Sequence, residues 1–402
     1  MTDFAVIIDW LSLVARWSHI AAAMAWFGAA FFFRSRELRL RPAPDLPADA
    51  IGSSWMFHGG GYIRSVKYHG QPEYAPTDAP LFKWESYFTW LTGFLLLALI
   101  YYTQARLFLI DEDKAALSPG AAIAISVGSL IGGWILYDLI CKVAINWRGP
   151  WLDLLVFALM MLASWGYHQL FTGRAATLHL GALLATIMVG NVFFVVIRNG
   201  KRAMAALRAG ETPDPADRNR LQQRGRHTRY LHLPILFLMV SVHYPLAFGT
   251  EWSWVLPGLV LVIGHAIGNG FETYYSAGRM PAWPWAAAAI LTIVMMWITS
   301  DSRFVLPRAA AVEALSENAR FAEVADVVAG RCSMCHGAEP AWGGVGTAPK
   351  HVLLDSPAGV LANAREIYLQ AGLSTAMPPG NVTWMTADER ALILDWYQDA
   401  AR

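Results

Sequence analysis

The stretch "AAIAISVGSLIGGWILYDLIC", residues 121–141, is apolar except for a few small polar residues and one aspartate. A helix of about 20 apolar residues crosses a hydrocarbon core about 30 Å thick. A helix also satisfies its backbone hydrogen bonds internally, as lipid requires. This stretch therefore predicts a membrane-spanning helix. Stretches of the same character lie at residues 10–33, 86–104, 151–171, 176–197, 231–249, 253–269 and 283–300.

The composition agrees with this prediction. Over 402 residues, 55% are hydrophobic and only 15% are charged, which is more apolar than a typical soluble enzyme. A formal net charge of +1 argues against a nucleic-acid-binding protein. We therefore expect an all-α fold, built as a polytopic bundle of about eight transmembrane helices in a lipid bilayer.

Lysine and arginine concentrate in alternate connections between these stretches. The connection at residues 34–85 holds seven and that at 198–230 holds nine, whereas the intervening connections carry only Arg106, Lys114 and Arg174. By the positive-inside rule the basic connections are cytoplasmic. We expect a bacterial inner-membrane protein whose N-terminus and C-terminal segment both lie on the periplasmic side.

The C-terminal segment contains "RCSMCHG", residues 331–337. The C-x-x-C-H pattern is typical of covalent haem c attachment, in which Cys332 and Cys335 form thioether bonds to the haem and His336 is an iron ligand. A zinc site would need a second ligand pair, and no further cysteine follows. Met377, in "STAMPPGN", is the predicted sixth ligand, and such His/Met ligation raises the reduction potential.

We expect three parts in the chain: a transmembrane domain at 1–300, a linker at 301–312 and a periplasmic domain at 313–402. The last part should hold a helix ending near Arg331, one at about 358–371 and one at about 386–401. Thr386 with Glu389 three residues on predicts a capping box for the last helix. These features resemble small class I cytochromes c.

Histidines inside the predicted spans are candidate ligands of a second haem, of the b type, because ionisable residues in membranes are costly. At 1.5 Å per residue His19 falls near mid-membrane, and His179 and His243 fall in the outer half. The alternative is a hydrogen-bonded packing residue, the interpretation favoured for His168, His232 and His265. Cys141 is expected to be an inert buried thiol.

The basic connection also contains "WMFHGGGYIRSVKYHG" at 55–70 and "LFKWESY" at 81–87. His58, beside three glycines, offers a base next to backbone that a planar ligand can approach. Arg64 and Lys67 can neutralise an anion. The aromatic residues that can stack on such a ligand are Trp55, Tyr62 and Trp84. An interfacial aromatic belt with a glycine turn explains the same residues without chemistry.

Six segments carry a resemblance to a known family. They are "RWSHIAAAMAWFGAAFFF", "HGGGYIRSVKY", "FKWESYFTWLTGF", "GGWILYDLIC", "GNVFFVVIRNGKRAMAALRAGETPDP" and "LPILFLMVSVHYPLAFG". Together, and in this order, the segments and the C-x-x-C-H domain resemble the membrane-bound bacterial urate oxidases fused to a C-terminal cytochrome c, the PuuD type.

The resemblance implies oxidation of urate to 5-hydroxyisourate. Electrons would pass to cytochrome c and the respiratory chain, without production of hydrogen peroxide. It implies His58 as general base, with Arg64 and Lys67 holding the charge of urate and with Glu85 and Asn191 as orienting partners. Two other functions remain open: a quinol-oxidising respiratory cytochrome subunit, and a helical anchor for an electron carrier.

Overall fold

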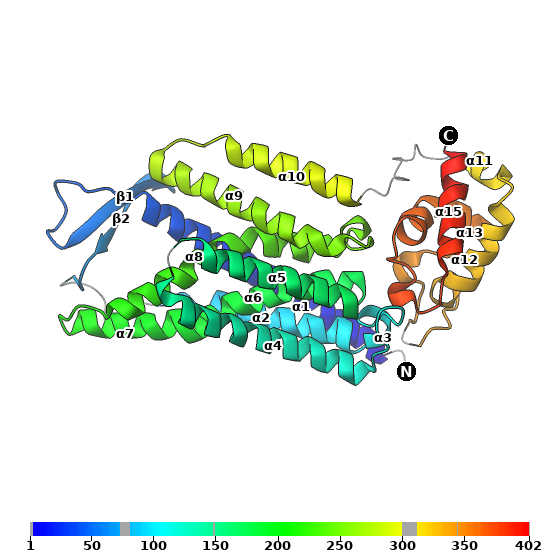
Figure 1. Ribbon diagram of the computed structural model, residues 1–402, viewed down its shortest axis with the longest axis horizontal. Coiled ribbons are helices and arrows are strands. Elements are labelled where there is room, and N and C mark those ends of the chain that lie inside the picture. Colours follow the sequence, from blue (N-terminus) through cyan, green and yellow to red (C-terminus); the bar gives the residue numbers. More distant parts are fainter. Residues whose placement is uncertain (1–2, 73–80, 148, 300–311, 344, 402) are drawn as a thin grey trace.

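The computed structural model describes residues 3–72, 81–147, 149–299, 312–343 and 345–401. The fold is mostly helical, with 72% helix and 5% strand. Most of the predicted linker, residues 301–311, lies outside the described residues. Figure 1 shows a long helical bundle with a strand hairpin at one end and a separate group of short helices at the other.

The bundle contains the apolar stretches. Its helices are α1 (Asp3–Leu38), α2 (Trp84–Leu97), α3 (Ala105–Phe108), α4 (Pro119–Val143), α5 (Trp151–Leu170), α6 (Gly173–Gly190), α7 (Ile197–Arg208), α8 (Pro215–Ser241), α9 (Leu256–Ala277) and α10 (Trp283–Thr299). Short π-helical segments, η1 (Ala98–Tyr102) and η3 (Asn191–Val196), extend α2 and join α6 to α7.

Helix α6 lies at the centre of the bundle, in contact with α4, α5 and α8. Leu180, Leu184 and Met188 on α6 are completely buried in the main apolar core. Large apolar side chains on the outer helices are exposed on the outside of the bundle: Trp17 on α1 is 72% exposed and Trp297 on α10 is 75% exposed. An apolar exterior around a packed interior suits a surrounding of lipid.

Four segments of the described chain are long and apolar enough to cross a membrane: Pro119–Asn146, Trp151–Leu170, Gly173–Arg208 and Ser253–Ala277. Trp283–Thr299 is apolar but shorter. The predicted stretch at 231–249 differs from the structure, because α8 begins at Pro215 and ends at Ser241. Residues 245–247 form only a 3-10 turn, which starts at Pro245, a residue that has no N–H to donate.

The connection at 34–85 is not simply a loop, which corrects the all-α expectation. Strands β1 (Ala50–His58) and β2 (Gly61–Tyr68) pair in antiparallel register, with Phe57 opposite Tyr62 and His58 opposite Gly61. Gly59 and Gly60, the two residues of the turn, have φ of +60° and +83°. A two-residue hairpin turn with positive φ at both positions favours glycine, so the local sequence explains the hairpin.

The C-terminal unit, residues 312–401 as far as they are described, has its own apolar core around Val324, Tyr368 and Trp396. Its helices are α11 (Val312–Glu317), α12 (Phe321–His336), α13 (Pro357–Ala362), α14 (Ala364–Ile367) and α15 (Ala387–Ala400), with the π-helical segment η7 (Tyr368–Gly372) after α14. The capping box of Thr386 and Glu389 is confirmed. Helix α12 ends at His336, several residues later than predicted.

The C-terminal unit contacts the end of the bundle opposite the hairpin (Figure 1). Asn381 Nδ2 donates a hydrogen bond of 2.6 Å to Asp113 Oδ2. A Cβ atom on Gly380 would lie 2.4 Å from the carbonyl oxygen of Ile110. The short loop after Met377 therefore sits directly on the bundle, where only a glycine fits.

Candidate functional site

The hairpin carries several of the predicted substrate residues and exposes them. His58 lies at its tip, exposed, next to the glycine turn. Trp55 and Tyr62 are 54% and 78% exposed, with their ring centroids 6.5 Å apart. The Arg64 guanidinium lies 5.1 Å from the centre of the Trp55 ring and pairs with Asp45. The structure thus groups these four residues on one ribbon.

Most of the remaining predicted residues lie elsewhere. Trp84 and Glu85 begin α2, where Trp84 is 59% exposed and one oxygen of Glu85, Oε2, is buried without a hydrogen-bond partner. Asn191 is buried among the bundle helices and is only 1% exposed. Lys67 is also on β2 of the hairpin, but it differs from the other predicted residues there because it lines the large cleft described next.

A cleft of about 1530 Å³ opens between the hairpin, the end of α1, the chain after α4 and the first half of α8. Its cationic lining residues are Arg34, Arg36, Lys67, Arg218, Arg226 and Arg229, and Glu37 is the one carboxylate among the described lining residues. This excess of positive charge is suited to an anionic ligand, because a cleft focuses the field of its walls.

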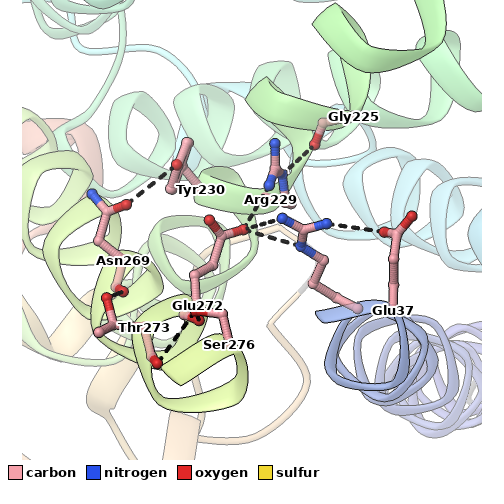
Figure 2. Close-up of polar contacts among 9 residues, drawn as sticks. Glu37, Gly225, Arg229, Tyr230, Asn269, Glu272, Thr273 and Ser276 are labelled. Atoms are coloured by element: carbon pink, nitrogen blue, oxygen red, sulfur yellow. Dashed lines mark hydrogen bonds and ion pairs between the residues drawn. The ribbon is translucent and has the colours of Figure 1, made fainter. Parts of the chain in front are cut away.

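One wall of the cleft is held by ion pairs. Glu272 on α9 accepts from Arg34 Nη2 at 2.9 Å and from Arg229 Nη1 at 2.6 Å, and Figure 2 shows Arg229 and Glu272 facing each other. Glu37 accepts from Lys67 Nζ at 2.7 Å and from Arg34. Partial burial alone would raise the pKa of the Glu37 carboxyl, but Lys67 and Arg34 outweigh burial and lower the pKa. Glu37 therefore stays ionised at neutral pH.

Asn191 belongs to a buried polar cluster deeper in the bundle. Arg224 Nη2 donates to Asp138 Oδ1 at 2.7 Å, with side chains only 3% and 9% exposed. Asn191 Nδ2 lies 3.2 Å from the hydroxyl of Tyr137, and its Oδ1 accepts from Arg224 at 3.3 Å. The hydroxyl of Tyr137 also contacts His227 Nδ1 at 2.7 Å. In this position Asn191 links α4 to α8.

The C-x-x-C-H residues lie at the end of α12. Cys332 and Cys335 form no disulfide, so both sulfur atoms are available for thioether bonds to a haem. His336 Nδ1 lies 3.0 Å from the carbonyl oxygen of Val352. A ring held through Nδ1 leaves Nε2 for a metal. Met377 packs against the same core as Cys332.

These contacts fit a haem c. The Met377 loop is fixed by two backbone contacts, because Met377 N donates to Gln370 O at 2.8 Å and Arg390 Nη1 donates to Met377 O at 2.8 Å. Both cysteines, the orienting bond on His336 and a positioned thioether are therefore present in one small unit. Among the residues described, no group of three or more His, Cys, Asp and Glu side chains forms another metal site.

The predicted haem b histidines differ in their surroundings. His19 Nδ1 lies 2.9 Å from the carbonyl oxygen of Thr89, and a Cβ on Gly93 would lie 2.9 Å from the ring. Both nitrogens of His179 are engaged, with Ser126 Oγ at 2.6 Å and Ala175 O at 2.7 Å. His243 is exposed, just beyond the end of α8. Of the three, His19 best fits a ligand, because its ring is anchored and faces a glycine.

Some residues of the cleft were not predicted from the sequence, notably Arg36, Ser54, Gln223 and Arg226. The signal available for Arg36 was its place directly after an apolar stretch, in "FFFRSREL". The positive-inside rule already explains an arginine at this position, so the sequence alone does not distinguish a role in topology from a role in the cleft.

The fold and the cleft define a helical protein suited to a membrane, with a cleft lined by cationic side chains at one end. The model of the urate oxidase N-terminal family matches residues 5–299, which is most of the chain. The chain belongs to this family. No curated protein and no solved structure matches it.

Proposed function

We propose that the chain is a membrane-bound oxidoreductase that converts urate to 5-hydroxyisourate and passes the electrons to a covalently bound haem c. The family match over residues 5–299 carries this proposal. The C-x-x-C-H motif follows the matched region in the same chain, which supports an electron acceptor attached to the oxidase.

Urate is a planar anion at neutral pH, and the cationic cleft offers it complementary charge. Addition of water at the purine C5 and loss of two electrons and two protons converts urate to 5-hydroxyisourate. The arginines of the cleft would bind and orient the anion, while ionised Glu37 keeps Lys67 in place. The role of general base for His58, and the orienting role of Glu85, stay predictions.

A haem c held by Cys332, Cys335, His336 and Met377 would supply one-electron chemistry and accept the two electrons in turn. The chain's own residues set up this site. The bond from His336 to Val352 orients the imidazole, and Arg390 holds the Met377 loop. Ligation by histidine and methionine favours acceptance of electrons, because it raises the reduction potential.

The hairpin, which forms one wall of the cleft, and the C-terminal unit lie at opposite ends of the bundle (Figure 1). Helix α1 has 36 residues and runs between the two ends, so they are separated by about 54 Å at 1.5 Å per residue. A single electron jump over this length would be too slow. We therefore propose a second haem, of the b type, inside the bundle, with His19 as a ligand.

We place this protein in the bacterial inner membrane, with eight spans and the C-terminal unit on the periplasmic side. The loop charges support this orientation, because C-x-x-C-H haem attachment takes place outside the cytoplasm. The next electron acceptor would be a soluble cytochrome c or a terminal oxidase.

The direct test uses the purified full-length holoprotein without oxygen. Adding urate should reduce its own haem c, seen in the visible spectrum, and should yield 5-hydroxyisourate without hydrogen peroxide. Reduction by a quinol with no response to urate would overturn the proposal in favour of a quinol-oxidising cytochrome. Labelling of residues 332–336 from the cytoplasmic side would overturn the proposed orientation.

A further inference from the structure

Arg36 is a buried cation without a carboxylate partner among the described residues. It is 9% exposed, and its Nη2 donates to the carbonyl oxygen of Ser54 at 2.6 Å and to Ser65 Oγ at 2.9 Å. Its Nε has no hydrogen-bond partner. Neighbouring Arg34, by contrast, is paired with Glu37 and Glu272. A buried charge without a counter-ion is costly, so this site is incomplete without an anion.

Other unpartnered atoms belong to the lining of the same cleft. Ser54 is 2% exposed, and its Oγ makes no hydrogen bond. On α8, the Oε1 atom of Gln223 and the Nε atom of Arg226 are also buried and unpartnered. All four residues line the cleft, from three different elements. Buried polar groups are nearly always hydrogen-bonded, so these four open groups are suited to binding a polar ligand.

The chemistry of the open atoms restricts that ligand. Arg36 Nε and Arg226 Nε can only donate, Gln223 Oε1 can only accept, and the hydroxyl of Ser54 can do either. A sulfate dianion has no donor for Gln223, and a hydrogen phosphate dianion has only a single P–OH and no ring N–H. An anion with carbonyl oxygens and ring N–H groups satisfies the whole set, and urate has both.

We propose that Arg36, Ser54, Gln223 and Arg226 form the urate-binding subsite of the cleft, an inference that rests on the proposed urate oxidation. Arg36 neutralises the anion and donates to one of its oxygens. Arg226, whose Nη2 pairs with Asp153 at 3.3 Å, donates to an oxygen through its open Nε. Gln223 accepts from a ring N–H. Specificity arises because a purine without these N–H groups leaves Gln223 unpaired.

The test compares Ser54→Ala, Arg36→Lys and the control Arg39→Gln in the full-length holoprotein. Arg39 lies three residues after Arg36, directly beyond the end of α1. It is exposed, and its guanidinium lies 5.0 Å from the ring centre of Tyr275, outside the cleft. Urate affinity is measured by calorimetry, KM by urate-driven haem c reduction, and stability by thermal unfolding without ligand.

Ser54→Ala should weaken urate binding roughly fivefold to tenfold, the cost of one neutral hydrogen bond. It should not lower the unfolding temperature of the free protein, because the hydroxyl has no partner to lose. Arg36→Lys should weaken binding by roughly 10- to 100-fold, since it removes the open Nε donor. Arg39→Gln should bind urate as the unmodified protein does.

Ser54→Ala keeps the hydrogen bonds of Arg36 to the Ser54 carbonyl oxygen and to Ser65 Oγ, so the test stays decisive even if Arg36→Lys fails to fold. Unchanged affinity and KM in Ser54→Ala, with a parent protein that oxidises urate, would overturn the subsite alone. A parent protein that neither binds nor oxidises urate would instead overturn the proposed function. Equal affinity for sulfate and urate would also contradict the subsite, because sulfate cannot donate a hydrogen bond to Gln223.

Discussion

Replacing Asp138 by asparagine should destabilise the bundle strongly. Arg224 has Asp138 as its one carboxylate partner among the described residues, at 2.7 Å, and its side chain is 3% exposed. Without that charge, Arg224 keeps only neutral acceptors, such as Asn191 Oδ1 at 3.3 Å. Leaving one member of a buried ion pair unpaired costs about 3–5 kcal/mol. We expect a loss of that size in the free energy of unfolding.

Replacing Arg224 instead of Asp138 should lower the free energy of unfolding by less. In Arg224→Met, Asp138 still has Lys142, whose Nζ lies at 2.6 Å and whose side chain is 65% exposed. A partner that reaches solvent offsets part of the penalty, so we expect a loss of about 2 kcal/mol. The double variant Asp138→Asn with Arg224→Met should lose less than the sum of the single changes, by about 1–3 kcal/mol.

Denaturant unfolding in one detergent, followed by tryptophan fluorescence, measures these differences. Lys142→Ala is the matched control, because an exposed ion pair contributes only about 0–1 kcal/mol. If Asp138→Asn is no more destabilising than Lys142→Ala, or if Arg224→Met is the worse of the two, the assignment of Arg224 as the dependent partner is refuted.

Three further changes test other parts of the molecule. Glu389→Gln should cost about 1–2 kcal/mol of stability at neutral pH, because it removes the ion pair with Arg331 and half of the capping box. Burial raises the pKa of Glu389, but Arg331 and the Thr386 backbone outweigh burial and lower the pKa from 4.5. The pair therefore stabilises above about pH 4.5 and loses its contribution as the pH falls through the lower folded pKa, which thermal unfolding against pH measures. His19→Ala should remove haem b and leave haem c, counted by a pyridine haemochrome assay, and c-type haem alone in the parent protein contradicts the second haem. Gly380→Ala should weaken the contact between the C-terminal unit and the bundle by about 2–4 kcal/mol. The φ of Gly380 is +56°, and a Cβ would clash with the carbonyl oxygen of Ile110, just after α3. Faster amide hydrogen exchange at residues 106–113 in this variant would show the weaker contact, and unchanged exchange would count against the contact.

Much of the helical fold is readable in the sequence, because apolar stretches of membrane length have few alternatives in lipid. Residues 121–141 lie within α4, and the capping box of α15 follows from two side chains three residues apart. The hairpin is harder to read. Its alternation of apolar and polar residues is imperfect, and the glycine turn is as typical of a loop as of a tight hairpin.

The candidate site is only partly visible in the sequence. Lys67 belongs to the predicted basic group and does line the cleft, but Arg36, Gln223 and Arg226 come from helices far apart in the chain. Their meeting depends on how α1 and α8 pack, which no local pattern encodes. Asp138 and Asn191 stand out in the sequence as polar residues within predicted membrane spans. Their link through Arg224, however, is a tertiary contact.

The hydrogen bond from Asn381 to Asp113, close to the loop of Met377, also limits which surfaces of the C-terminal unit another protein can contact. The surface that contacts the bundle is not available for binding a second protein. A partner that receives electrons from the proposed haem c would therefore bind a face of the C-terminal unit that points away from the bundle.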